Sequence, residues 1–230
     1  MHSLSIDRTA PAFVETSSRL RRLYPDYPRV YPVAAMAEQG KRRWVRLSDA
    51  IDAGRIDLMF RRSAAEMSSV DAAAEVVATA LVHAVIGRVV APLVLDARAW
   101  DPGVDNVWIH FDSDGGIDWA GVVDTTIRLL PGDPRAGEPG TVTLPCEAAL
   151  AVWTAHRAVG ALDAVLAKLA DCARLDSRRF WSIVGESVVG ASTYVPVLAR
   201  SSATDGMRRG QAVLDAIVAA GRPVRGARVA

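Results

Sequence analysis

One stretch of the sequence is apolar enough to decide the architecture: residues 76–95, VVATALVHAVIGRVVAPLVL. Twenty residues of this composition form a helix that either crosses a membrane or is enclosed by protein. His83 and Arg88 lie in its middle, and a central arginine costs about 2.5–3.5 kcal/mol in a membrane helix. Since this would also be the only span in the chain, we expect a buried or half-buried helix that ends near Pro92, and no membrane span.

Charge is balanced over the whole chain but unevenly distributed along it. The 230 residues carry 27 basic and 26 acidic side chains, so no global basic field would draw the protein onto nucleic acid. Residues 1–62 have an excess of five positive charges, residues 63–176 an excess of nine negative charges, and residues 177–230 again five positive charges. The two basic ends either converge on an anionic ligand or are solvated faces that dock on the acidic middle, which is the commoner outcome.

The spacing of apolar and helix-capping residues predicts a single domain over residues 1–230, of class α+β and mainly α. Its first part, residues 1–100, is expected to be helical, with helices over residues 11–23, from Ser48, and from Ser68 or Ser69. The helix from Ser48 would turn one face inward, with Ile51, Arg55, Leu58 and Met59.

A small antiparallel sheet is predicted near residues 104–130. Two β-rich runs flank an Asp/Gly loop at residues 112–116 and form a hairpin, and residues 122–130 supply a third antiparallel strand of a meander. The C-terminal part, residues 141–222, is again expected to be helical. Its helices are predicted from Thr143 to about Arg174, after Asp176, and from about Gly206 to Ala220.

The two cysteines, Cys146 and Cys172, are too few for a disulfide framework or a four-cysteine metal site. On one helix their Cα atoms would be about 39 Å apart, so they could not pair or share a metal. Cys146 would then lie near a helix N-terminus, where the dipole lowers the pKa of a thiol. A reactive thiol is one interpretation of Cys146, and an inert buried cysteine is the other.

Short motifs assign no reaction to the chain. The four histidines show no metal-binding spacing, and His83 and His156 fit apolar helix faces as core residues. The loop that starts at Asp112 resembles a calcium loop, but its twelfth position is Val123 instead of glutamate. Neither a nucleophile elbow nor a P-loop nor a dinucleotide fingerprint is found, which argues against hydrolase, kinase and nicotinamide oxidoreductase chemistry. We predict no metal site.

Several elements of the second half occur in a recognisable order. One helix contains RRFWSIVG at residues 178–185, a later one contains RRGQAVL at residues 208–214, and RVVAPL at residues 88–93 precedes the hairpin. In this order, over residues 65–222, they resemble the FhuF-type ferric-siderophore reductases. In that family a C-terminal Cys-Cys pair and a following Cys-x-x-Cys hold a [2Fe-2S] cluster. The present chain continues after residue 220 as GRPVRGARVA, so no cluster ligand can be carried over.

The resemblance implies a cytoplasmic iron- or siderophore-handling protein that binds a ferric chelate or a similar small polar ligand without carrying the electron. Either the cluster has been lost, or the sequence ends before the redox motif. Residues 1–8 show no secretory signal, which also favours the cytoplasm. We expect no cofactor, and we choose Trp181, Arg178 and Arg179 as residues for an anionic or aromatic ligand, with His110 as a polar group on the sheet.

Two other classes of function stay open. In one, the chain is a non-catalytic interaction or scaffold protein whose exposed apolar helices form a homodimer or a complex, and Trp181 belongs to the core. In the other, it is an enzyme whose site is assembled only by folding, with His83, His110 and His156 as the first residues to inspect. Whether the protein is an enzyme is therefore not decided by the sequence.

Overall fold

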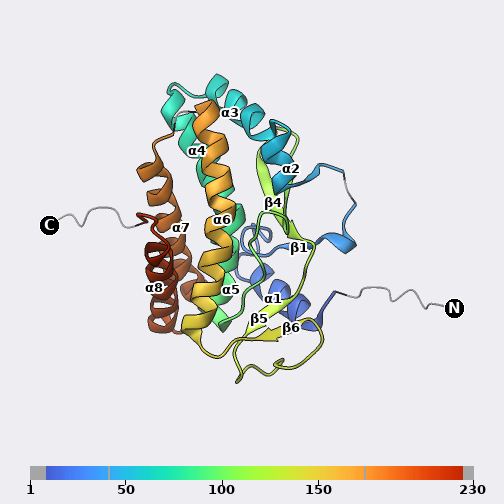
Figure 1. Cartoon of the computed structure of the whole chain (residues 1–230). Coiled ribbons are helices and arrows are strands. Elements are labelled where there is room, and N and C mark those ends of the chain that lie inside the picture. The colour runs from blue at the N-terminus through green and yellow to red at the C-terminus, as the bar shows by residue number, and fades with distance from the viewer. Residues whose placement is uncertain (1–8, 41, 174, 225–230) are drawn as a thin grey trace.

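The computed structural model describes residues 9–40, 42–173 and 175–224 (Figure 1). It is 58% helical and 11% strand, which confirms the predicted class, α+β and mainly α. Residues 1–8, for which we predicted no secretory signal, lie outside the described residues. So do residues 225–230 at the C-terminal end, which contains no cysteine.

The apolar stretch belongs to one long helix over residues 70–96. Its parts are α4 (Val70–Val82), a π-helical turn η2 (His83–Gly87) and α5 (Arg88–Asp96). Ser69 caps the helix, since its side chain accepts a hydrogen bond from the Ala72 N–H, as the sequence predicted. The predicted end near Pro92 is wrong. Proline removes only one hydrogen bond of the helix, and every residue of α5 before Asp96 is buried, so packing maintains the helix.

Two helices of the described chain are long and apolar enough to cross a membrane, by length and composition alone. In the one over residues 70–96, 78% of the apolar window is buried inside the fold, and in α6 (Glu147–Ala173) the share is 50%. Core helices of soluble proteins have these properties, so the fold is compatible with a soluble protein.

The C-terminal helices pack side by side with the long helix. α6 packs against α4 and α8 (Ala203–Ala219), while α7 (Ser177–Leu198) and α8 pack against each other and against α5 (Figure 1). α7 is capped by Asp176, as expected. α6 begins at Glu147 and not at Thr143.

The first part holds α1 (Pro11–Arg21), α2 (Leu47–Asp52) and α3 (Arg55–Glu66). The single helix predicted from Ser48 is wrong in two respects. Leu47 already belongs to α2, and Gly54, with φ of +70°, separates α2 from α3. This backbone conformation is one that glycine adopts without steric cost.

A mixed sheet of four strands lies against this helical part. The predicted hairpin is confirmed as β3 (Val107–Phe111) and β4 (Ile117–Val122). Two short strands complete the order β1-β4-β3-β2: β1 (Ala34–Ala35), which is parallel to β4, and β2 (Trp44–Arg46), which is antiparallel to β3. A short 3₁₀ helix, η1 (Met36–Glu38), follows β1.

The predicted third antiparallel strand over residues 122–130 is wrong. After Val122 the chain leaves the sheet, because Asn106 Oδ1 accepts hydrogen bonds from the N–H groups of Val123 and Asp124. β5 (Ile127–Leu129) then pairs in parallel with β6 (Thr141–Thr143) as a separate two-stranded sheet. Thr143, predicted as a helix cap, therefore belongs to a strand.

Candidate functional site

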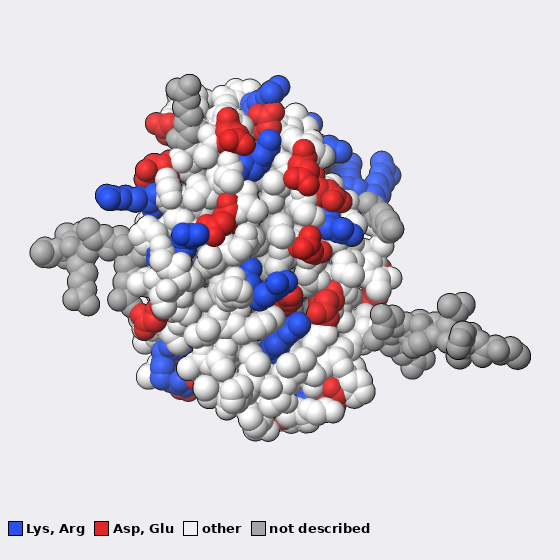
Figure 2. All heavy atoms as spheres, in the orientation of Figure 1, with Lys and Arg blue, Asp and Glu red and all other residues white. Residues whose placement is uncertain are grey.

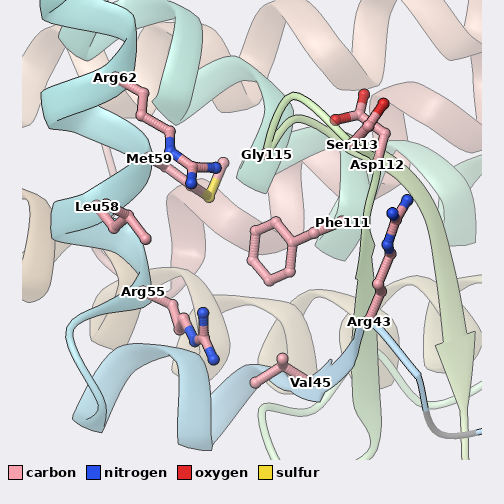
Figure 3. Close-up of a pocket in the computed structure, with 10 residues that line it drawn as sticks. All are labelled: Arg43, Val45, Arg55, Leu58, Met59, Arg62, Phe111, Asp112, Ser113 and Gly115. Atoms are coloured by element: carbon pink, nitrogen blue, oxygen red, sulfur yellow. The ribbon is translucent and has the colours of Figure 1, made fainter.

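A cavity of about 390 Å³ lies between α3 and the end of the sheet formed by β2 and β3. Its volume is within the range of small-molecule sites. Figure 3 shows α3 on one side, with Phe111 facing it from the sheet. Its lining residues are Arg43, Val45, Arg55, Leu58, Met59, Arg62, Phe111, Asp112, Ser113 and Gly115.

Helical spacing places the α3 residues of the cavity on one face. Arg55 and Arg62 are seven residues apart, which is close to two full turns, and Leu58 and Met59 lie between them on that face. The sequence predicted that this face points inward. In the structure Met59 is buried, whereas Leu58 and both arginines are exposed at the cavity.

The Arg62 guanidinium lies against the hairpin loop at Gly115. Gly115 has φ of +84°, and a Cβ atom at this position would overlap Nη1 of Arg62. A residue with a side chain would therefore both strain the loop and displace the guanidinium. The absence of a side chain at Gly115 is part of what positions Arg62.

Arg43 enters the cavity from the other edge, where Figure 3 shows it beside Asp112 and Ser113. Its φ is +65°, an uncommon conformation for a residue other than glycine. The Arg43 carbonyl accepts a hydrogen bond from the Phe111 N–H, which ties this residue to β3.

The three cavity arginines form no ion pair with a described residue, although the Asp112 carboxylate lies beside Arg43. None of Arg43, Arg55 and Arg62 forms an ion pair or side-chain hydrogen bond with another described residue. By contrast, Asp112 Oδ1 accepts hydrogen bonds from the N–H groups of Asp114 and Gly116, so this carboxylate is used to build the loop. The cavity therefore offers positive charge beside an apolar wall, which suits an anionic ligand with an apolar part.

A larger groove, of about 620 Å³, lies next to α1 but is a weaker candidate. Its central arginine, Arg98, donates to Asp133 at 2.7 Å and to Glu15 at 2.9 Å. Burial opposes the charge of Arg98, but these hydrogen bonds outweigh burial and raise its pKa. Arg19 and Arg209 in the same groove are also bound to acidic residues. The positive charges of this groove are thus already neutralised.

The predicted ligand residues on α7 fall into different environments. Trp181 lies in the core, with 1% of its surface exposed, in edge-to-face contact with Phe180. Arg179 is held in ion pairs with Glu75 and Glu186, whereas Arg178 is exposed. None of the three lines a cavity described here.

His110 lies on the sheet in a cluster of its own. Its Nδ1 donates to Asp118 Oδ1 at 2.6 Å, and its ring packs on Trp44, with the ring centroids 5.1 Å apart. Asp118 also accepts a hydrogen bond from Arg29, whose guanidinium stacks on Trp119. The structure therefore does not bring His110 together with the α7 residues predicted beside it.

The three histidines of the enzyme hypothesis line no common cavity among those described. His83 Nε2 donates to the Val30 carbonyl at 2.8 Å, and desolvation by burial lowers the pKa of His83 to about 4. The expectation that His156 is a core residue is wrong, because it is exposed and lines a groove with Arg157 and Asp163. Of the described residues, no group of three or more His, Cys, Asp or Glu could hold a metal ion.

Arg88, next to the π-helical turn, is buried and forms no ion pair with a described carboxylate. Its Nη1 donates to the carbonyls of Arg29 and Pro32, while its Nε has no partner among the described residues. Burial lowers the pKa of Arg88 to about 9, so the side chain is still mostly protonated at neutral pH. Together with His83, it fastens residues 29–32 to the long helix.

The two cysteines do not fit an iron–sulfur cluster. Cys146 directly precedes α6, and Cys172 lies in the last turn of the same helix, about 39 Å away. Cys146 is exposed, which corrects the interpretation as a buried cysteine. Burial raises the pKa of the Cys172 thiol.

The sequence signal for the cavity was the basic excess of residues 1–62, which includes Arg43, Arg55 and Arg62. No described residue of the second basic block, residues 177–224, lines this cavity, so the described parts of the two basic ends do not converge there. Figure 2 shows basic and acidic side chains intermixed over one face of the molecule.

No protein-family model, curated protein or solved structure matches the chain, and the resemblance to the FhuF-type reductases stays a prediction.

Proposed function

We propose that the protein binds a small anionic ligand with an apolar body in the cavity between α3 and the sheet. The observation that carries this proposal is the set of three arginines, Arg43, Arg55 and Arg62, that share one cavity and have no carboxylate partner among the described residues. A guanidinium binds carboxylates, phosphates and other planar anions through paired hydrogen bonds. Phe111 and Met59 supply the apolar contact.

Among anionic ligands, the resemblance to ferric-siderophore reductases favours an anionic ferric chelate. We propose ligand binding only and assign the protein no redox step. We no longer assign the ligand to Trp181, Arg178 and Arg179, because Trp181 is buried and Arg179 forms ion pairs with two carboxylates.

The test is a calorimetric titration with two iron complexes of different charge, an anionic ferric triscatecholate and a neutral ferric trihydroxamate. We expect the anionic complex to bind more tightly. The triple variant Arg43→Gln, Arg55→Gln, Arg62→Gln should weaken it by about tenfold or more, because the counter-charges are lost.

The matched control is the triple variant Arg42→Gln, Arg61→Gln, Arg178→Gln, which removes the same charge from exposed positions outside the cavity. It should bind like the wild type. No binding of the anionic complex, or equal weakening by the two triple variants, would contradict the proposal.

A second candidate function is self-association through α7. Val189, Tyr194, Val197 and Leu198 are exposed on this helix, and no charged residue occurs between Glu186 and Arg200. We expect a second copy of the chain as the partner. Light scattering after size exclusion should then give the mass of a dimer, and Tyr194→Asp should give a monomer. A wild-type monomer at high concentration would rule this candidate out.

A further inference from the structure

The arrangement of Arg55 and Arg62 indicates the shape of the ligand as well as its charge. Seven residues along an α-helix correspond to a rise of about 10 Å. Both side chains extend from α3 toward the cavity, one from its first turn and one two turns later. The Cα atoms that carry the two guanidiniums are therefore about 10 Å apart along the axis of α3.

The wall between these two positions is apolar. Leu58 and Met59 lie between the arginines on α3, and Phe111 faces α3 across the cavity. Met59 is 8% exposed, so it forms the floor, while Leu58 forms the rim at 40% exposed. A flat apolar body fits between these side chains more favourably than a charged or strongly hydrated one.

Neighbouring residues leave both guanidiniums available. Arg61, adjacent to Arg62, forms an ion pair with Asp57 at 2.8 Å, which uses the acidic residue of the first turn of α3. Gly115 leaves the space that the Arg62 guanidinium occupies. At the opposite edge, Asp112 presents negative charge beside Arg43, which disfavours an anionic group there.

We infer that the ligand is a rod-shaped dianion, with a flat apolar body between two anionic groups about 10 Å apart, one at Arg55 and one at Arg62. This inference rests on the anion site of the proposed function, and it selects an extended dianion over a compact ferric chelate. The anionic groups are carboxylates or phosphates, since a guanidinium binds both in the same way.

The test uses three probes in calorimetric titrations of the full chain: a biphenyl dicarboxylate with its carboxylates at opposite ends, the corresponding monocarboxylate, and the shorter one-ring dicarboxylate. We expect the long dianion to bind about tenfold more tightly than either of the others. In Arg55→Gln and in Arg62→Gln this advantage should disappear, whereas Arg61→Gln should retain it. Thermal unfolding of each variant checks that the fold is intact.

The outcomes separate this inference from the proposed function. Equal affinity of the long dianion and the monoanion, or tighter binding of the short dianion, would overturn the rod-shaped ligand while anion binding stands. If none of the probes and no anionic ferric complex binds, both are wrong. A loss of selectivity in Arg61→Gln alone would also overturn the inference.

Discussion

Arginines serve opposite purposes in two regions of this molecule. In the groove next to α1, Arg98 is 6% exposed and its guanidinium is shared between Asp133 and Glu15. In the cavity beside α3, Arg55 and Arg62 are exposed and have no carboxylate partner among the described residues. The same side chain thus connects elements of the fold in one region and is left available in the other.

The difference shows why a large groove with charged residues need not be a binding site. An anion that enters the groove would have to displace Asp133 or Glu15 from Arg98. An anion that enters the cavity beside α3 has no carboxylate to displace from Arg55 or Arg62 among the described residues. The distinction between the two regions can be tested by the stability and binding of single variants.

The largest effect should come from breaking the buried pair. Arg98→Met leaves Asp133, whose side chain is 7% exposed, without its main partner, so we expect a loss of about 3 kcal/mol in the free energy of unfolding. Urea denaturation measures it. Arg98→Met combined with Asp133→Asn should recover part of the loss, and a stability of the single variant near that of the wild type would show that the groove arginine is not structural.

The pH dependence of stability tests the contribution of His83, which binds the Val30 carbonyl. The pKa of His83 is lowered from 6.5 to about 4, so this ring is neutral in both states only at pH values well above 6.5. As the pH falls toward 4, the unfolded chain binds a proton that the folded chain does not, and up to about 3 kcal/mol of stability is lost. His83→Gln keeps a donor for the Val30 carbonyl but does not titrate.

Denaturation of wild type and His83→Gln at several pH values from 7 to 4 isolates this contribution. We expect the two stability curves to approach each other as the pH falls. Parallel curves over the whole range would mean that His83 titrates alike in the folded and unfolded chain.

Gly115→Ala probes the loop that receives Arg62. Because its φ is +84°, a Cβ atom should cost about 1 kcal/mol of stability and also displace the guanidinium, so binding of the anionic ligand should weaken. Gly132→Ala is the control, since a Cβ there meets no atom within 4 Å. Equal effects of the two substitutions on binding would exclude a positioning role for Gly115.

The smallest effect on stability should come from the cavity arginines themselves. Because Arg55 and Arg62 make no ion pair with described residues, each change to glutamine should alter the free energy of unfolding by no more than about 0.5 kcal/mol. Thermal and urea denaturation provide the measurement. A loss as large as that of Arg98→Met would remove the contrast between the two regions.

The sequence predicted the parts of the fold that depend on local patterns. The long helix follows from one apolar stretch, and the hairpin of β3 and β4 follows from two β-rich runs around an Asp/Gly loop. The strands it missed are short or pair with distant residues. β1 has two residues and pairs with β4, more than eighty residues later, and no periodicity is visible over so short a segment.

The candidate site shows the same limit. Arg55 and Arg62 were recognisable as basic residues at helical spacing, but their proximity to Phe111 depends on how α3 packs against the sheet. Trp181 was chosen together with Arg178 and Arg179 for an anionic or aromatic ligand, yet Phe180 and Arg222 pack against its ring in the core. Sequence pattern distinguishes an enclosed tryptophan from an exposed one poorly, since both fit an apolar helix face.

The most direct test of the account observes the guanidinium groups during binding. NMR signals of the arginine Nε–Hε groups, assigned with the single glutamine variants, can be followed while a diamagnetic gallium triscatecholate or the long biphenyl dicarboxylate is added. We expect the signals of Arg55 and Arg62 to shift until the site is saturated, while that of Arg98 stays in place. Shifts at Arg98 with none at Arg55 and Arg62 would contradict it.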